Sequence, residues 1–394
     1  MSPEQLVAQE APALILIASA AFVLPLLAIR LRVPGVVLEI LFGVLIGPVF
    51  SIVQEGPFLN ELGELGLFLL MFLSGFEIDL GMFSRRRPRQ LITGLTVFVL
   101  TIGTAYVAAR LLGHGFFLTF VLATTSVGLV VPTLRSTRRI GTPLGQIILM
   151  SALLADFLTL LGVTAVALIK EHGVTFQLLY LPVYFIVIAA VLLLVRRIAW
   201  WRPEWFGRLF DLDDPEEVGI RGSLALMLIF IGLSLVLGIE PILGAFLAGA
   251  VFAVVFQHRG ALEQKLSGFA YGFLIPIFFI NVGIRFDLHE LGETKILIEA
   301  AALIGLAILV KLIPSLALAR RHRPMREVLA AGLLLSARLS LIIAVAELGV
   351  QLGIIDRVLE AQIILLAAVT STLGPALFRV LLPPLPAVNE PSPE

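Results

Sequence analysis

Two charged side chains stand inside long apolar runs, where a charge is costly and therefore informative. Asp156 lies in LLADFLTLL (153–161), and Lys311 lies in AILVKLIPSLALARR (307–321). Counted from the predicted cytoplasmic helix ends, they lie ~18 Å and ~14 Å deep at about 1.5 Å per residue. Burial favours a protonated carboxyl group and a nearby ammonium favours an ionised one, so Asp156 could hold a proton or a cation. Intramembrane charges commonly mark an ion or proton path; the alternative is a purely structural pair.

Hydroxyl groups cluster in a second apolar stretch, ATTSVGLVVPTL (123–134). Gly128 and Pro132 weaken the helix expected here, and Thr124, Thr125 and Ser126 can serve freed backbone groups or a cation. Broken helices at membrane depth are tolerated only where they are buried in protein or line a cavity. The sequence therefore predicts a broken helix beside the ion path, or alternatively an ordinary kinked helix.

The corresponding segment of the second half, LLLSARLSLII (333–343), contains Arg338. This arginine either caps the ends of a second broken helix or acts in transport. Glu39 and Glu77 are weaker candidates, since one could pack structurally and the other could extend to the membrane surface. Asn281 is a candidate polar contact only.

Metal and cofactor sites find no support in the sequence. The chain has no cysteine, which excludes disulfides and thiolate ligands. The histidines are scattered over different connections, so we expect no resident metal beyond a transported alkali cation. No GxxxxGK[ST] loop occurs, so we expect no ATP-driven pump and no cofactor.

The composition is that of a polytopic membrane protein. Apolar residues make up 59% of the 394 and charged residues 14%, against about 25% charged in soluble domains. The net charge is zero, and nothing indicates a nucleic-acid partner. The predicted fold is all-α with thirteen transmembrane helices, near 12–31, 36–53, 59–80, 90–112, 116–133, 144–170, 175–195, 219–238, 241–257, 266–284, 295–319, 326–349 and 358–381.

Lysine and arginine are distributed unevenly among the connections between these helices. With the N-terminus outside, 20 of the 28 basic residues fall in inside connections and four in outside ones. The positive-inside rule therefore predicts an external N-terminus and a cytoplasmic C-terminus in the cell (inner) membrane.

Two parts of the sequence resemble each other at a near-constant spacing. Gly75 in FLSGFEIDL matches Gly283 in INVGIRFDL, and Gly43 matches Gly249, at offsets of 206 to 208 residues. A shift of seven helices inverts the second half, as in secondary transporters. We expect inverted six-helix repeats at 1–174 and 219–382, joined by a linker helix and interfacial segment at 175–218 and followed by a short tail at 383–394.

Four stretches resemble the transmembrane domain of monovalent cation:proton antiporters, the branch with Kef-type potassium efflux systems and NapA-like sodium/proton exchangers. They are PGVVLEILFGVLIGP, ELGLFLLMFLSGFEIDL, LGAFLAGAVFA and FLIPIFFINVG. The resemblance implies a homodimer with a scaffold and a mobile core, which exchanges Na⁺ or K⁺ for H⁺. It also implies two broken helices crossing beside an essential aspartate, matched by Asp156, and a basic partner, matched by Lys311.

The sequence departs from this family at two positions. The family usually has Asp, Asn or Gln before the essential aspartate, where this chain has Ala155, and an acid two residues after Arg338, where it has Ser340. With fewer acids, we expect Lys311 to pair directly with Asp156. Cation binding would then displace this pairing and a proton, giving one-for-one exchange.

Other functions remain open from the sequence. A Kef-like potassium efflux protein is one, although the chain shows no nucleotide-binding domain. A sodium-coupled organic-anion symporter of similar architecture is another, and it would need polar sodium ligands in place of an Asp–Lys pair. A non-transporting sensor is the third, favoured by the missing core acids.

Overall fold

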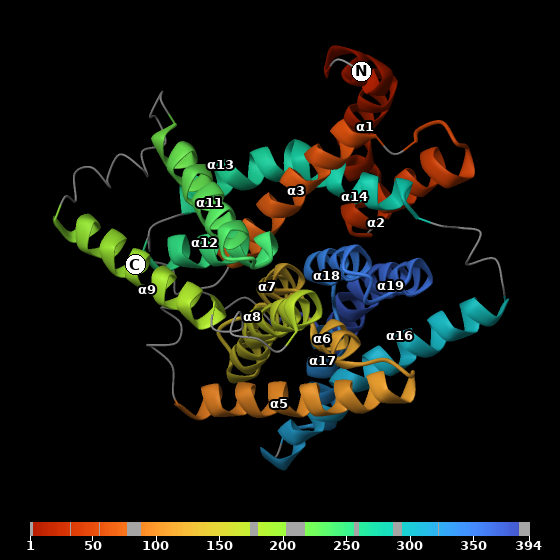
Figure 1. The fold of residues 1–394 in the computed structure, drawn as a ribbon. Helices are drawn as coiled ribbons and strands as arrows, with labels where there is room; N and C mark the ends of the chain where they lie inside the picture. Colours follow the sequence, from red (N-terminus) through yellow and green to blue (C-terminus); the bar gives the residue numbers. More distant parts are fainter. Residues whose placement is uncertain are drawn as a thin grey trace, which may run out of the picture. The chain divides into compact units, whose positions relative to one another are not determined.

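All regular secondary structure in the part of the chain that the computed structural model describes is helical (Figure 1). That part comprises residues 3–31, 33–54, 56–76, 88–173, 180–201, 217–255, 260–286, 294–321 and 323–385. The predicted all-α class is confirmed for these residues.

Nine of the described helices are long and apolar enough to cross a membrane, and a bent pair, Met325–Leu335 with Ser340–Gln351, raises the number to ten. Three shorter apolar helices, Gly35–Val49, Tyr180–Leu194 and Pro241–Val254, lie where further spans were expected. The count of thirteen therefore stays a prediction, because it depends on whether these short helices span.

The chain folds into two compact units, and each draws on both halves of the sequence. The first unit contains residues 1–85, 160–299 and 344–363, and the second contains 86–159, 300–343 and 364–394. The predicted repeats are consecutive parts of the sequence, whereas each structural unit combines three separate segments of the chain. The two divisions therefore describe different things. Several helices, among them α8 and α18, begin in one unit and end in the other.

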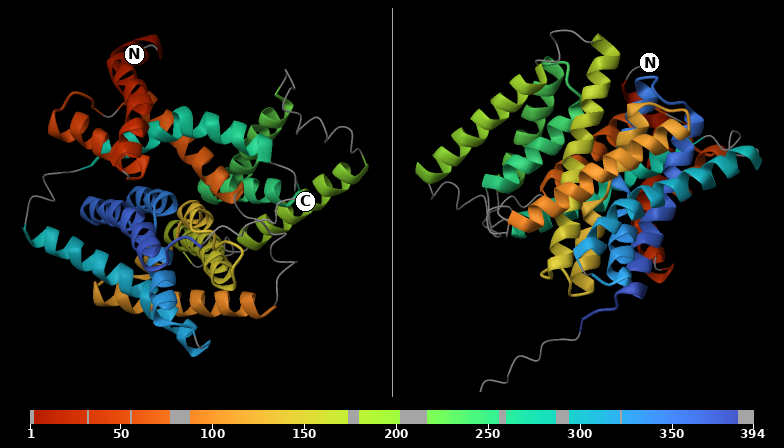
Figure 2. Two further views of the ribbon diagram at one scale, coloured as in Figure 1. Left: turned by 180° about the vertical axis from the view of Figure 1, so that it is seen from behind. Right: turned by 90° about the horizontal axis from the view of Figure 1, so that it is seen from below.

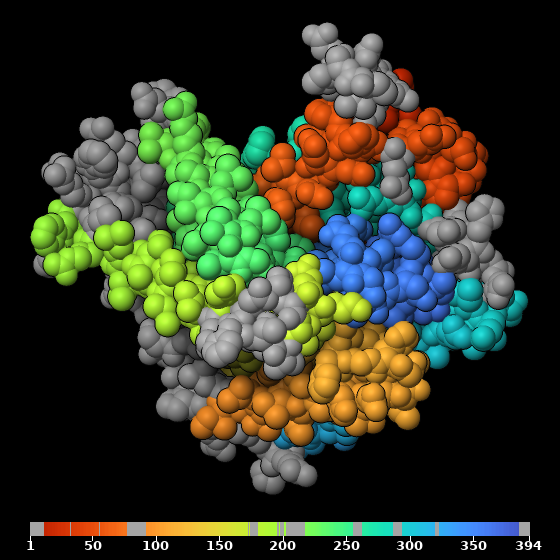
Figure 3. All heavy atoms as spheres, viewed as in Figure 1, coloured from red at the N-terminus to blue at the C-terminus, as the bar shows by residue number. Residues whose placement is uncertain are grey.

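The helices of the first unit pack closely where glycines meet backbone. Its elements are α1 (Pro3–Leu31), α2 (Gly35–Val44) with a π-helical turn (Leu45–Val49), α3 (Pro57–Phe76), α9 (Tyr180–Trp201), α11 (Val218–Val236), α12 (Pro241–Val255), α13 (Gly260–Phe269), a second π-helical turn (Ala270–Leu274) and α14 (Ile275–Ile284). Within this unit α12 packs against α3 and α14 packs against α2 (Figures 1 and 2). Apolar side chains of α11 such as Ile229 and Val236 remain exposed, and α11 forms part of the green surface in Figure 3, as expected of a helix that faces lipid.

Four glycines make these two packings possible, and they are the glycines that the sequence repeat pairs. A Cβ on Gly43 would overlap the carbonyl of Ile280 beside Gly283, and a Cβ on Gly75 would overlap the carbonyl of Phe246 on α12. Gly249 in turn lies against the backbone of α3. The predicted repeat relates Gly43 to Gly249 and Gly75 to Gly283, so it would exchange the two contacts. Such exchange is expected of halves related by a two-fold axis.

The second unit contains both breaks. Its elements are α5 (Pro88–Leu111), α6 (Phe116–Ala123), α7 (Val127–Ser136), the first part of α8 (Pro143–His172), α16 (Thr294–Ser315) with a 3₁₀ turn (Leu316–Arg321), α17 (Met325–Leu335), the start of α18 (Ser340–Gln351) and the later part of α19 (Arg357–Leu381). The first break separates α6 from α7, and the second separates α17 from α18 at an angle of 44°.

Gly128 and Pro132 were expected to cause the first break, but both lie inside α7. The helix is interrupted instead at Thr124–Ser126, where the backbone is extended. Threonine and serine side chains compete with helical hydrogen bonds, and here the second break accepts hydrogen bonds from the Thr125 hydroxyl and the Ser126 amide.

Candidate ion-binding site

The two breaks of the second unit are joined by hydrogen bonds. The Ser126 amide donates to the carbonyl of Ala337 (2.9 Å), and the Thr125 hydroxyl donates to the carbonyl of Leu335 (3.0 Å). Each break therefore satisfies polar groups that the other loses, which non-helical backbone at membrane depth requires.

Arg338 completes this crossing from the second break. Its Nε donates to the carbonyl of Thr124 (3.0 Å), and its Nη2 donates to the carbonyls of Leu122 (2.7 Å) and Ala307 (3.0 Å). The side chain is fully buried. Arg338 thus caps the end of α6, which belongs to the first broken helix and not to its own, and the carbonyls there would otherwise be costly to leave unpaired.

Asp156 lies on α8 and faces the start of α7. Its Oδ2 accepts a hydrogen bond from the amide of Val127 (3.3 Å), the first residue of α7. The side chain is only 5% exposed. A helix N-terminus carries a partial positive charge and unpaired N–H groups, so it stabilises an anion.

Lys311 lies on α16 and faces the end of α6. Its Nζ donates to the carbonyl of Ala123 (2.5 Å) and to the hydroxyl of Thr125 (2.7 Å), and the side chain is 3% exposed. The C-terminal end of a helix carries a partial negative charge, which stabilises a cation. The carboxylate and the ammonium therefore occupy oppositely charged ends of the same interrupted helix.

The structure brings the main predicted residues together in the second unit, but it assigns the hydroxyls a different task. The Thr124 hydroxyl donates to Val121 of its own helix (2.8 Å), and the Thr125 hydroxyl joins Lys311 to the second break. Ser126 contributes its backbone amide. The Thr125 hydroxyl thus stabilises the crossing; a role of the three hydroxyls as cation ligands stays a prediction, as does a direct pair between Asp156 and Lys311.

The remaining predicted residues have other surroundings. Glu39 is buried on α2 of the first unit, and Asn281 on α14 donates to Asn60 (3.0 Å). Ser340 begins α18, two residues after Arg338. Glu77 lies outside the described residues.

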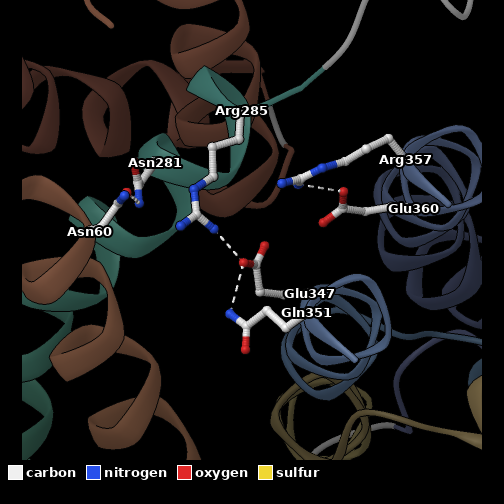
Figure 4. Close-up of polar contacts among 7 residues, drawn as sticks. All are labelled: Asn60, Asn281, Arg285, Glu347, Gln351, Arg357 and Glu360. Atoms are coloured by element: carbon white, nitrogen blue, oxygen red, sulfur yellow. Dashed lines mark hydrogen bonds and ion pairs between the residues drawn. The ribbon is translucent and has the colours of Figure 1, made fainter. Parts of the chain in front are cut away.

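The first unit holds a charged network that was not anticipated (Figure 4). Arg285, at the end of α14, forms an ion pair with Glu347 of α18, and Gln351 donates to the same carboxylate oxygen (3.1 Å). Arg357 and Glu360 form a second ion pair on α19 (2.9 Å). The two glutamates in otherwise apolar helices were the signal in the sequence that could have indicated it.

Backbone groups at the site were also missed, namely the Val127 amide and the carbonyls of Ala123, Leu335 and Ala337. No residue type marks them, because every residue carries an amide and a carbonyl. Among the residues that the structure describes, no group of histidine and acidic side chains could hold a resident metal.

Comparison with known proteins identifies relatives over nearly the whole chain. Residues 17–382 match the family model "Sodium/hydrogen exchanger, transmembrane". The chain is 34% identical to the "Putative Na(+)/H(+) antiporter YjbQ" of Bacillus subtilis, over 93% of this chain and 62% of YjbQ. It is 28% identical to the "Na(+)/H(+)-K(+) antiporter GerN" of Bacillus cereus, over 90% and 91% of the two chains.

A solved structure supports the fold independently. The sodium proton antiporter MjNhaP1 of Methanocaldococcus jannaschii superposes with a TM-score of 0.65 over 95% of this chain and 96% of that one, at 13% identity. This likeness shows the fold, and the family match shows the class of protein, which consists of transporters and not of enzymes. The chain therefore belongs to the sodium/hydrogen exchanger family of multi-pass membrane proteins.

Proposed function

We propose that this protein exchanges Na⁺ or K⁺ for protons at Asp156 by alternating access. The observation that carries the proposal is the position of the Asp156 carboxylate at the start of α7, with Lys311 at the end of α6. A buried carboxylate in this position can bind either a proton or an alkali cation, and each lowers the affinity for the other. This competition couples the two fluxes.

Lys311 and Arg338 have distinct tasks in this mechanism. Arg338 donates to three carbonyls and keeps the crossing intact. Lys311 competes with the cation for Asp156, so that arrival of the cation releases a proton from the pair. With Ala155 in place of a second polar residue, the exchange is one for one.

The printed names of the relatives leave two cations open. YjbQ is named for Na⁺ and H⁺, whereas the name of GerN includes K⁺ as well. This chain spans about three fifths of the length of YjbQ, so activities of that protein as a whole are not transferred. The homodimer, the inner-membrane location, the external N-terminus and the division into repeats belong to this proposal.

The test is proton flux in proteoliposomes that hold an imposed pH gradient. Sodium, potassium, lithium and choline are added in turn to wild type, Asp156→Asn and Glu64→Gln, the last being a control at an exposed position of α3. We expect one or more alkali cations to dissipate the gradient in wild type and in the control. Flux with Asp156→Asn should fall to that of empty liposomes, because the amide binds neither a proton nor a cation by charge.

Two results would contradict the proposal. Cation-dependent flux that persists in folded Asp156→Asn would show that another group carries the ions. Absence of flux from folded wild type, together with sodium uptake that depends on an organic anion, would favour a symporter; absence of both would favour a sensor.

A further inference from the structure

A proline leaves one backbone carbonyl next to Lys311 without its usual partner. Pro314 lies inside α16 and has no N–H, so it cannot donate to the carbonyl of Val310, four residues earlier. Val310 is buried and directly precedes Lys311. An unpaired carbonyl at this depth would be costly, so its partner bears on the geometry of the site.

Thr104 of α5 supplies a partner from the neighbouring helix. Its hydroxyl lies 3.0 Å from the carbonyl oxygen of Val310 and at the same distance from the carbonyls of Leu100 and Thr101 on its own helix. A hydroxyl has one proton to donate. Donation to Val310 satisfies the carbonyl that Pro314 has freed, whereas Leu100 and Thr101 belong to an uninterrupted stretch of α5.

The same part of α16 is also bonded to the crossing of the two breaks. Ala307, one turn before Lys311, accepts a hydrogen bond from Arg338, and Lys311 itself donates to Ala123 and Thr125. Thr104 thus completes the contacts that fix this turn of α16, within the second unit of the fold.

We infer that Thr104 is a positioning residue for Lys311, acting through the Val310 carbonyl that Pro314 leaves free. This inference rests on the proposed function and deepens it, because it adds a residue that neither touches the ion nor carries a charge. The charged groups that act on Lys311 are Arg338 and Asp156. A shift of the α16 turn would change its distance from both and thereby the pH at which exchange proceeds.

The experiment compares the pH profile of cation/proton exchange among variants of the full chain. Thr104→Val removes the hydroxyl at constant shape, and Thr104→Ser retains it. Thr96→Val is the matched control, because Thr96 is also on α5 but donates only to Ile92 of its own helix (2.7 Å). We expect the pH midpoint to move by about half to one unit in Thr104→Val, the effect of one interhelical hydrogen bond. Thr104→Ser and Thr96→Val should match wild type.

A second substitution tests the role of the proline. Pro314→Ala restores an N–H that can bond Val310, so Thr104→Val should have little effect in the Pro314→Ala background. Thermal unfolding of the same four proteins (wild type, both single variants and the double variant) measures this coupling without reference to transport.

The outcomes separate the inference from the proposed function. An unshifted profile in folded Thr104→Val, or an equal shift with and without Pro314, would overturn the inference while exchange by wild type stood. If wild type showed no exchange, the proposed function would fail. The unfolding measurements would still test the inference, because additive effects of Thr104→Val and Pro314→Ala would exclude the contact between Thr104 and Val310.

Discussion

The residues of the site show how a charge is tolerated inside a membrane protein. Asp156 and Lys311 each contact the end of an interrupted helix, and Lys311 also donates to the Thr125 hydroxyl. Backbone dipoles supply partial charges that cost no further desolvation when an ion arrives or leaves. This arrangement is compatible with the proposed exchange of a proton for a cation at the Asp156 carboxylate.

Ala155, which directly precedes Asp156, is packed inside α8. Its side chain is buried, and its carbonyl accepts a hydrogen bond from the hydroxyl of Thr159. A polar residue here could offer a further ligand, whereas alanine leaves Asp156 as the acid that the site contributes from this helix. The proposed one-for-one exchange of monovalent cations moves no net charge, so it is expected to be insensitive to membrane voltage.

At the residue scale, the carboxyl group of Glu240, in the connection between α11 and α12, is predicted to make the stability of the protein depend on pH. Burial, and after it the charge of Glu171, raises the pKa of the Glu240 carboxyl from 4.5 to about 7. The folded state therefore binds more protons than the unfolded state between pH 4.5 and pH 7, and stability falls as the pH rises through this window.

The measurement is the thermal unfolding midpoint as a function of pH, for wild type and Glu240→Gln. The variant should lose the decrease between pH 4.5 and 7, because a neutral amide has no proton to release. Glu61→Gln, at an exposed position of α3, serves as the control. Parallel curves for wild type and Glu240→Gln would show that another group titrates.

At the scale of elements, the fold depends on helices that approach each other backbone to backbone. Small residues permit such packing in membranes, where the hydrophobic effect does not drive helices together. Gly75 of α3 lies so close to α12, and Gly249 of α12 so close to α3, that a methyl group on either glycine would overlap a backbone carbonyl of the other helix.

Substitution of these glycines by alanine should therefore destabilise the first unit. We expect Gly75→Ala and Gly249→Ala each to cost about 1–3 kcal/mol, the usual penalty of overpacking. Gly232→Ala on α11 is the control, since a Cβ there meets nothing within 4 Å and alanine favours the helix. Thermal unfolding in detergent gives the comparison; midpoints for Gly75→Ala at or above that of Gly232→Ala would disprove the close packing.

Helix positions were largely predictable from the sequence, because a membrane span is a run of about 20 apolar residues. The predicted 358–381 corresponds to α19 (Arg357–Leu381), and 144–170 corresponds to α8 (Pro143–His172). The first break was less predictable: Gly128 and Pro132 pointed to it, yet it falls at Thr124–Ser126. Tertiary hydrogen bonds to Leu335, Ala337 and Arg338 decide its position.

At the scale of the whole molecule, the two sequence halves are distributed over two structural units. The chain returns to each unit several times, so neither repeat could fold into one of these units alone. The predicted inverted repeat would relate the two breaks, one from each half of the sequence, and the proposed alternating access would use this relation to remake the same contacts facing the opposite side.

The orientation of the molecule can be tested directly because the chain has no cysteine. Gly115 and Gly141 are suitable sites for single cysteines, since a Cβ at either position meets nothing within 4 Å. A membrane-impermeant maleimide should label Gly115→Cys in intact cells, and Gly141→Cys only after permeabilisation, because the arginines near Gly141 favour the cytoplasm. The reverse pattern would overturn the predicted topology.

The sequence by itself determined the class of the protein, the positions of its long helices and the two charges at its centre, because hydropathy and isolated charges are properties of local composition. Only the tertiary structure decided what those charges contact. The partners of Asp156 and Lys311 include the Val127 amide and the Ala123 carbonyl, and the Val310 carbonyl accepts a hydrogen bond from Thr104, which lies 206 residues earlier in the sequence. Backbone groups are the same at every residue, so only the fold can select which of them face an ion.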